Sequence, residues 1–316
     1  MMNNHTMVRN FVLWGFSHLQ EFQVLLFLFI LLVYVLIMLG NLSIITITYF
    51  DSRLHSPMYF FLCNFSLMEM LVTSTVVPRL LADLLSTHKT ISLAECLTQS
   101  FFYFSLGSTD FLILTAMAFD RYIAICRPLH YPTIMSNQVC VRLVVACWVV
   151  GFFSIISPTI QKSQLWFCGP NVIDHFFCDS APLLKLSCSE THHIERMDFF
   201  LSLLFVLTTL LLILISYIFI VVSVLRIPSS SGRQKAFSTC ASHLTVVFLG
   251  YGSSIFIYVR PSKGHSTDFN KVVALLTSVV TPFLNPFIFT FRNEKVKEVI
   301  EDIVKKILSR DSGALR

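Results

Sequence analysis

An acidic and a basic residue, Asp120 and Arg121, stand side by side near the end of a long apolar run. Between Cys96 and Ile125 the only other charged residue is Asp110. A charge at the centre of a bilayer costs roughly 2.5–3.5 kcal/mol on insertion scales, so a paired acid and base favour the membrane edge. The plainest role for this pair is to anchor the end of a helix there.

Two other acids, Glu69 and Asp110, lie inside apolar stretches. Two carboxylates in a membrane core cannot both ionise cheaply, because each charge loses its hydration and repels the other. They would either share a proton or hold a cation. A protonated pair that only stabilises packing is the alternative.

The composition of the 316 residues favours a membrane protein with several spans. Apolar residues make up 55% of the chain and charged residues 13%, against about a quarter charged in soluble domains. The net charge is +5 at pH 7. Part of it follows the last apolar stretch, where it suits an anionic lipid surface better than nucleic acid. The polar first residues lack the apolar core of a cleavable signal peptide.

Seven apolar stretches are each long enough to cross a bilayer as a helix, which needs roughly 20 residues. A helix satisfies its backbone hydrogen bonds internally, whereas an open sheet does not. We therefore predict an all-α fold, a seven-transmembrane helix bundle with a short amphipathic eighth helix on the cytoplasmic face. The predicted spans are 23–50, 57–82, 96–119, 139–160, 197–225, 236–259 and 271–291.

This pattern divides the chain into an extracellular N-terminus at 1–22, a transmembrane domain at 23–291 and an amphipathic helix with a cytoplasmic tail at 292–316. The basic tail favours a cytoplasmic C-terminus. Asn4 begins a glycosylation sequon, which agrees with an outer N-terminus. Apolar residues from Val296 onward recur at helical spacing, as in a helix that lies on a membrane surface.

The nine cysteines separate by predicted location. Four lie at or beyond the outer ends of the helices, in an oxidising compartment, and allow three disulfide connectivities. The other five, in membrane or inner positions, are expected to be reduced. The outer group is Cys96, Cys168, Cys178 and Cys188, and the inner group is Cys63, Cys126, Cys140, Cys147 and Cys240.

Several stretches closely resemble odorant receptors, a branch of the rhodopsin-like class A G-protein-coupled receptors, and in particular its tetrapod-type class II branch. Together they touch nearly every predicted helix. They are MAFDRYIAIC…PLHY at 117–131, LHSPMYFFLCNFSLMEM at 54–70, CGPNVIDHFFCDSAPLLKLSC at 168–188, KAFSTCASHLTVV at 235–247, PFLNPFIFTFRNEKVK at 282–297, Gly40-Asn41 and Ser216-Tyr217.

The resemblance implies a plasma-membrane receptor, not an enzyme, that binds small volatile hydrophobic odorants and activates an olfactory-type stimulatory G protein to raise cAMP. An export chaperone and membrane lipid are expected partners. It also implies the disulfides Cys96–Cys178 and Cys168–Cys188. The residues it assigns to G-protein coupling are Asp120, Arg121, Tyr122, Tyr217, Lys235, His243, Asn285, Pro286 and Phe289, while Ser238 and Thr239 add hydroxyl groups on the same helix.

Two positions depart from the family pattern. Phe289 stands where the family usually has Tyr, so the hydroxyl is missing there. The acids Glu69 and Asp110 stand where Asp and Glu are usual, as if their lengths were exchanged between helices. Relatives bind sodium near this place, so we expect Glu69 and Asp110, with Asn41 and Asn285 close by, to form a cation-linked or proton-linked brake on activation.

The odorant should lie between the outer halves of the third, fifth, sixth and seventh predicted helices, as the resemblance implies. The residues that we expect there are apolar and aromatic with a few hydroxyls, as in most small-molecule sites. The expected lining is Tyr103, Phe104, Gly107, Ser108, Leu201, Leu204, Phe205, Tyr251, Ser254, Ile255, Tyr258, Leu275 and Ser278.

Other functions remain as alternatives. A channel or transporter would also suit buried acids, but the chain lacks the internal repeats common in transporters. A membrane enzyme is disfavoured, because no His-Glu-x-x-His or Gly-x-Ser-x-Gly motif is present. His175, Cys178 and Asp179 could suggest a metal site, but the sulfur of a cystine is not a thiolate ligand. A receptor of the same fold that detects a metabolite outside the nose is the closest alternative.

Overall fold

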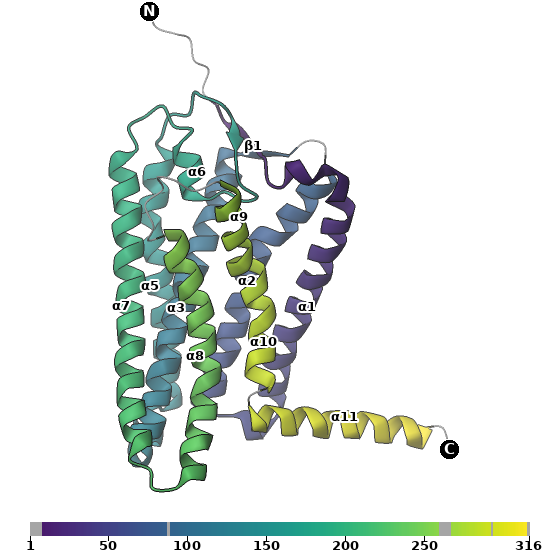
Figure 1. Cartoon of the computed structure of the whole chain (residues 1–316), viewed down its shortest axis with the longest axis vertical. Helices are drawn as coiled ribbons and strands as arrows, with labels where there is room; N and C mark the ends of the chain where they lie inside the picture. The colour runs from purple at the N-terminus through teal and green to yellow at the C-terminus, as the bar shows by residue number, and fades with distance from the viewer. Residues whose placement is uncertain (1–7, 87–88, 259–266, 292, 315–316) are drawn as a thin grey trace, which may run out of the picture.

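The computed structural model describes residues 8–86, 89–258, 267–291 and 293–314, and within them it leaves some side chains outside the description. Long helices form an elongated bundle (Figure 1). They are α1 (Gln23–Phe50), α2 (Pro57–Leu85), α3 (Leu93–Cys126), α5 (Asn137–Ser163), α7 (His192–Leu225), α8 (Ser230–Tyr258) and the continuous run of α9 (Thr267–Leu275), a π-helical turn η4 (Leu276–Val280) and α10 (Thr281–Phe291).

Six of these helical runs are long and apolar enough to cross a membrane, counting the described residues only. The remaining one, α8, is a helix of 29 residues and packs between α7 and α10. The all-α bundle predicted from the sequence is therefore confirmed. Most spans are longer than the apolar stretches alone suggested, because polar residues at their ends continue the helices.

The third span is the clearest case of this extension. It begins at Leu93 rather than Cys96 because Ser92 caps it: the Ser92 hydroxyl accepts the amide of Glu95 at 3.3 Å, and the Glu95 carboxylate accepts the amide of Ser92 at 2.9 Å. It ends at Cys126 rather than 119, so Asp120 and Arg121 lie within the helix. This helix is central, in contact with α2, α5, α7 and α8.

A lid covers one end of the bundle (Figure 1). The N-terminal strand β1 (Asn10–Leu13) pairs antiparallel with β2 (Thr90–Ser92) and parallel with β3 (Val172–Ile173). The short helices η1 (Ser17–Phe22) and α6 (Ser180–Leu184) complete the lid. Apolar side chains such as Phe11 and Ile173 form a separate core beneath the sheet. The segment before the first span was expected only to be a polar extension, yet it carries the middle strand of this sheet.

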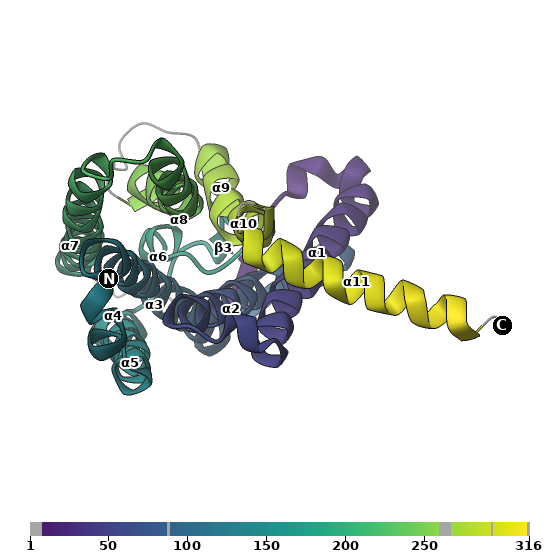
Figure 2. The same ribbon diagram turned by 90° about the horizontal axis from the view of Figure 1, so that it is seen from below.

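The other end of the bundle carries three short helices and one long one. These are η2 (Ser52–Leu54), η3 (Pro128–His130), α4 (Tyr131–Ile134) and α11 (Glu294–Ala314). Helix α11 runs across the base of the bundle and projects beyond it (Figure 2). Arg53 joins it to the first loop, because its guanidinium forms ion pairs with Asp51 and Asp302 at 2.9 and 2.8 Å.

Candidate functional site

The Asp120–Arg121 pair lies at the end of the bundle opposite the lid. Asp120 is fully buried and holds the guanidinium of Arg121 at 3.0 Å. The Tyr131 hydroxyl of α4 donates to the other Asp120 oxygen at 2.7 Å. Both carboxylate oxygens thus have partners, as a buried charge requires. The pair does more than anchor a helix, because it ties α3 to the short helix that follows.

A second set of contacts joins α3, α7 and α8 close by. His243 Nε2 lies 3.0 Å from the carbonyl oxygen of Leu114, which can only accept, so this nitrogen carries the proton. In a neutral ring Nδ1 then accepts, and the Tyr217 hydroxyl donates to it at 2.9 Å. His243 and Tyr217 are both buried. One imidazole therefore links three helices through a single tautomer.

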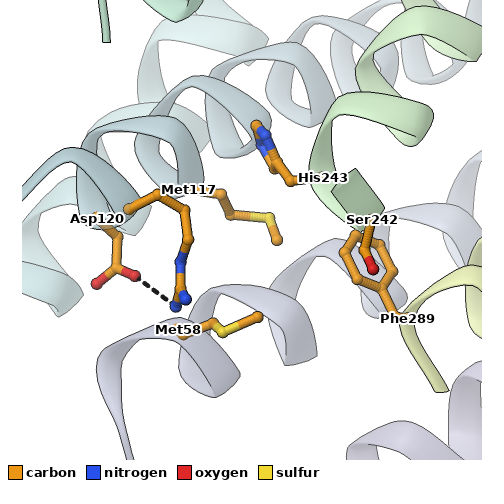
Figure 3. A pocket seen from close by; sticks show the side chains of 7 residues that line it. Met58, Met117, Asp120, Ser242, His243 and Phe289 are labelled. Carbon is orange, nitrogen blue, oxygen red and sulfur yellow. Dashed lines mark hydrogen bonds and ion pairs between the residues drawn. The ribbon is translucent and has the colours of Figure 1, made fainter. Parts of the chain in front are cut away.

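Between these two sets lies a small cavity of about 10 Å³, which is close to the space that one water molecule needs. Its lining comes from α2, α3, α8 and α10, and Figure 3 shows Met58 and Met117 projecting between Asp120 on one side and His243 with Phe289 on the other. Phe289 also lines a second cavity of about 10 Å³ towards α1, and its ring packs edge-on against Phe65 at 5.8 Å. The residue that departs from the family pattern therefore separates two cavities.

The acids expected to form a brake come together in the middle of the bundle. Asn285 Nδ2 donates to Glu69 Oε1 at 2.5 Å, and Asp110 lies near enough to Glu69 for their charges to interact. Asp110 Oδ1 and Asn285 Oδ1 are buried without a hydrogen-bond partner. Asn41 instead donates to the backbone oxygens of Ile37 and Pro282. The unpartnered oxygens suit a hard cation, which prefers oxygen ligands.

The lid contains both expected disulfides. Cys96–Cys178 ties the start of α3 to the loop before α7, and Cys168–Cys188 closes that loop on itself. With Cys178 oxidised, the metal alternative loses its thiolate. Burial lowers the pKa of the neighbouring His175 to about 3, so its ring is neutral at physiological pH. Among the described residues no group of three or more His, Cys, Asp and Glu is arranged to hold a metal.

The residues expected to line an odorant site fall into two groups. Several face the interior, including Tyr103, Tyr251 and Ser278. Tyr251 packs against Phe111 of α3 at 4.6 Å, whereas the Ser278 carbonyl accepts the hydroxyl of Thr73 on α2 at 3.1 Å. Also buried or half-buried are Phe104, Gly107, Ser108, Phe205, Ser254 and Leu275.

Two expected contacts on α7 are placed elsewhere. Leu201 and Leu204 are 40% and 66% exposed on the outer surface of the bundle. Helix α7 is apolar on every side, so its composition does not reveal which side faces inward. Counting back from Tyr217 in helical steps would have selected the buried positions Val206 and Thr209 instead.

Some expected residues cannot be placed in this way. The following lie outside the described residues: Asn4 and the side chains of Lys235, Ser238, Thr239, Ile255 and Tyr258. Of the remaining coupling residues, Pro286 is buried in α10, while Tyr122 is half-buried with its ring 5.7 Å from Phe219 of α7.

Comparison with known proteins decides the family. A family model described as olfactory receptor matches residues 30–310. Human olfactory receptor 6J1 is 53% identical over 296 residues, which cover 94% of this chain and 85% of the relative. Human olfactory receptor 6C3 is 48% identical over 305 residues, which cover 96% of this chain and 98% of the relative. Mouse olfactory receptor 6E1 is 51% identical over 306 residues, again 96% and 98%. This chain belongs to the olfactory receptor family.

The olfactory receptor family consists of receptors, not enzymes, and the apolar helices agree with a multi-pass membrane protein. Sequence reasoning missed two features of this olfactory receptor. Leu129 of η3 is 90% exposed at the end where Arg121 lies. Lys271 of α9 is 2% exposed and pairs with Asp174 of the lid at 2.5 Å. The position of Leu129 directly after Pro128 could have indicated its exposure. Nothing local in the sequence indicates that Lys271 is buried and paired with Asp174.

Proposed function

We propose that this olfactory receptor binds small, mainly hydrophobic odorants between the outer halves of α3, α7, α8 and α9. Binding there activates an olfactory-type stimulatory G protein at the opposite end and raises cAMP. The observation that supports this most strongly is the joint set of contacts around Arg121, Tyr217 and His243. It links α3, α7 and α8 beside a cavity at one end of the bundle.

The proposed orientation is a plasma-membrane receptor with its N-terminus outside and its C-terminus in the cytoplasm. Two disulfides in the lid suit an oxidising exterior. The basic residues of α11 suit contact with anionic lipid on the inner leaflet. Export is proposed to need a chaperone.

The middle of the bundle would act as the brake. Glu69, Asp110 and Asn285 together offer oxygen ligands to a sodium ion, or they share a proton when none is bound. A bound cation would supply the positive charge that lets both acids ionise. The Asn285–Glu69 hydrogen bond joins α10 to α2, so loss of the cation or gain of a proton would shift how these two helices pack.

The deciding experiment measures cAMP in cells that carry an olfactory-type stimulatory G protein and a receptor export chaperone. An N-terminal tag reports surface display, and a broad odorant panel is applied beside an Arg121→Ala control. A dose-dependent rise that the control abolishes supports coupled odorant reception. No rise at good display, with any odorant, would count against it.

Phe289→Tyr adds the hydroxyl that the family pattern would supply. The hydroxyl would enter the cavity that Ser242 and His243 also line, so we expect constitutive cAMP to change. Equal constitutive output at matched display would show that the missing hydroxyl has no bearing on coupling. If the wild type is silent and Phe289→Tyr responds, weakened coupling rather than a missing ligand explains the silence.

A further inference from the structure

The outer part of α7 is attached to the bundle in a different way from the rest of that helix. From Val206 to Val224, buried residues recur every three or four positions, and most of them join the main core. Residues 195–205, all of which the structure describes, include no buried side chain. Helix α7 lies at one edge of the bundle (Figure 1), so apolar packing leaves about three of its turns weakly held.

A buried lysine reaches this stretch from the neighbouring helix. Lys162, in the last turn of α5, is 6% exposed, and its ammonium lies 2.8 Å from Asp198 Oδ2. Directly before it, Gln161 Nε2 lies 3.1 Å from the sulfur of Met197. A lysine is almost never fully buried unless it is paired. The pair with Asp198 is therefore what allows Lys162 to lie at the contact between α5 and α7.

The same carboxylate oxygen also accepts a hydrogen bond from the lid. The Ser180 hydroxyl of α6 donates to Asp198 Oδ2 at 2.6 Å, and the Ser180 amide donates to Asp179 Oδ1 at 2.8 Å. Asp179 follows Cys178, which is bonded to Cys96 of α3. Asp198 is thus held from two directions, by α5 and by a segment that is covalently attached to α3.

Asp198 lies on the same face of α7 as the buried residues further along. With 3.6 residues per turn, its direction from the helix axis differs by about 20° from those of Phe205 and Thr209, and by about 120° from that of Leu204. Phe205 is half-buried and Thr209 is buried, whereas Leu204 is 66% exposed. A contact at Asp198 therefore sets which residues of the outer turns face inward, a choice that the apolar sequence of α7 does not make.

We propose that Lys162 and Asp198 are positioning residues for odorant binding: their ion pair, in place of apolar packing, fixes the rotation of the outer turns of α7. The pair turns Phe205 towards the proposed odorant site and leaves Leu201 and Leu204 towards lipid. Buried ion pairs suit this role, because the best-attested use of a buried polar group is to select one register among several. The inference rests on the proposed odorant function for the site that this face lines, while the attachment itself is tested without odorant.

The first test measures which residues of α7 face lipid. Purified receptor in lipid nanodiscs carries a bimane fluorophore on Leu204→Cys or on Phe205→Cys, and a lipid with a nitroxide on its acyl chain quenches the bimane that it reaches. Signal from receptor without an added cysteine is subtracted. We expect quenching to be roughly threefold stronger at position 204 than at position 205. Lys162→Met keeps the side-chain length without the charge and should bring the two values together, because few buried contacts then hold these turns.

Two further variants keep this test decisive if Lys162→Met folds poorly. Exchange of the charges, with Lys162→Asp and Asp198→Lys together, should restore the difference between the two positions, and Asp198→Asn, which keeps an acceptor for Ser180, should give an intermediate difference. Arg196→Gln is the matched control and should change nothing, because Arg196 is an exposed charge of α7 that donates to its own helix at the His192 carbonyl. A full difference in Lys162→Met, or no recovery on charge exchange, would overturn the positioning role.

The second test follows odorant binding. Thermal stabilisation of purified receptor by straight-chain alcohols and aldehydes needs no G protein, and cAMP is measured beside it. Lys162→Met should raise the half-maximal odorant concentration roughly tenfold in both assays, because binding must then also order the outer turns of α7. Charge exchange should restore the original concentration, and Arg196→Gln should leave it unchanged.

The two failures are distinguishable. If the unsubstituted receptor neither binds nor signals with any odorant, the proposed odorant function fails while the quenching result still decides the positioning role. If the receptor responds and quenching changes in Lys162→Met but the half-maximal concentration does not, the pair positions α7 and its link to odorant binding is overturned.

Discussion

At the scale of single residues, the hydroxyl of Tyr217 has one partner, His243 Nδ1. Tyr217→Phe removes that donor and leaves a buried ring nitrogen without a partner, which costs about 1–3 kcal/mol. We therefore expect purified Tyr217→Phe to unfold at a lower temperature than the wild type. Tyr122→Phe is the control, because the Tyr122 side chain is only half-buried and its ring, which the variant keeps, packs on Phe219. Equal unfolding temperatures for the two variants would refute the role of the Tyr217–His243 bond.

His175 and Asp179 make opposite contributions to the pH dependence of lid stability. Burial lowers the pKa of His175 from 6.5 to about 3, so the unfolded state binds more protons and stability is lost as pH falls below 6.5. Burial raises the pKa of Asp179 from 3.8 to about 6, so the folded state holds its proton more tightly and stability is lost as pH rises through 6.

Substituting each residue should separate the two effects. His175→Asn keeps an acceptor near the Phe177 amide, which now donates to Nδ1 at 3.4 Å, but it does not titrate. Its thermal stability should fall less than that of the wild type between pH 7 and pH 4.5. Asp179→Asn keeps the acceptor for the Ser180 amide, and its thermal stability should fall more than that of the wild type over the same pH range. Identical pH profiles for wild type and His175→Asn would show that the neutral histidine is not the acid-sensitive group.

At the scale of elements, the crossing of α3 and α5 depends on one glycine. A Cβ at Gly151 would lie 2.2 Å from the hydroxyl oxygen of Thr109 and 2.9 Å from its backbone nitrogen. The backbone there cannot yield as a side chain would, and overpacking costs about 1–3 kcal/mol. Gly151→Ala should therefore lower both surface display and unfolding temperature. Gly252→Ala on α8 meets nothing within 4 Å and should lower neither; a matching loss in both variants would show that the α3–α5 crossing is not the cause.

The helices were largely predictable from the sequence and the directions of their faces were not. The first span was predicted at 23–50 and the structure has it at Gln23–Phe50, because apolar length alone decides where a bilayer helix fits. The inward face of α7 was misplaced at Leu201 and Leu204, since lipid and protein interior both select apolar residues. The inward face of a helix could be recognised only where a polar side chain such as Tyr217 needs a hydrogen-bond partner inside the bundle.

The lid illustrates a different limit. Strand β1 joins segments about 80 and 160 positions apart in the sequence, and pairing over such distances leaves no local periodic signal. The disulfides were implied by family resemblance rather than by spacing. The buried aromatic segment at 175–177 was visible only as His-Phe-Phe next to a cysteine, and its burial follows from the disulfide and the strand pairing that hold its two ends.

At the scale of the whole molecule, helix α3 runs from the lid to the opposite end of the bundle. The lid is bonded to the start of α3 through Cys96–Cys178, while the contacts of His243 join α3, α7 and α8 towards the opposite end. Between them, Asn285 of α10 donates to Glu69 of α2, and Asp110 of α3 has a buried carboxylate oxygen without a hydrogen-bond partner. This is the level at which we propose the brake on activation.

The last prediction tests that brake. If Glu69 and Asp110 hold a cation or share a proton, agonist potency of the wild type should depend on sodium and on pH, because each stabilises the resting packing of α2 against α3. The double variant Glu69→Gln, Asp110→Asn keeps hydrogen-bonding groups of the same size but cannot ionise, so both dependences should disappear. Asp83→Asn is the matched control, since Asp83 is also a buried acid of α2 but pairs with Arg79 at 3.0 Å. Agonist dose–response curves at matched surface display, with sodium replaced by a large organic cation, give the measurement. Sodium and pH sensitivity that survive in the double variant would leave the two acids as packing residues only.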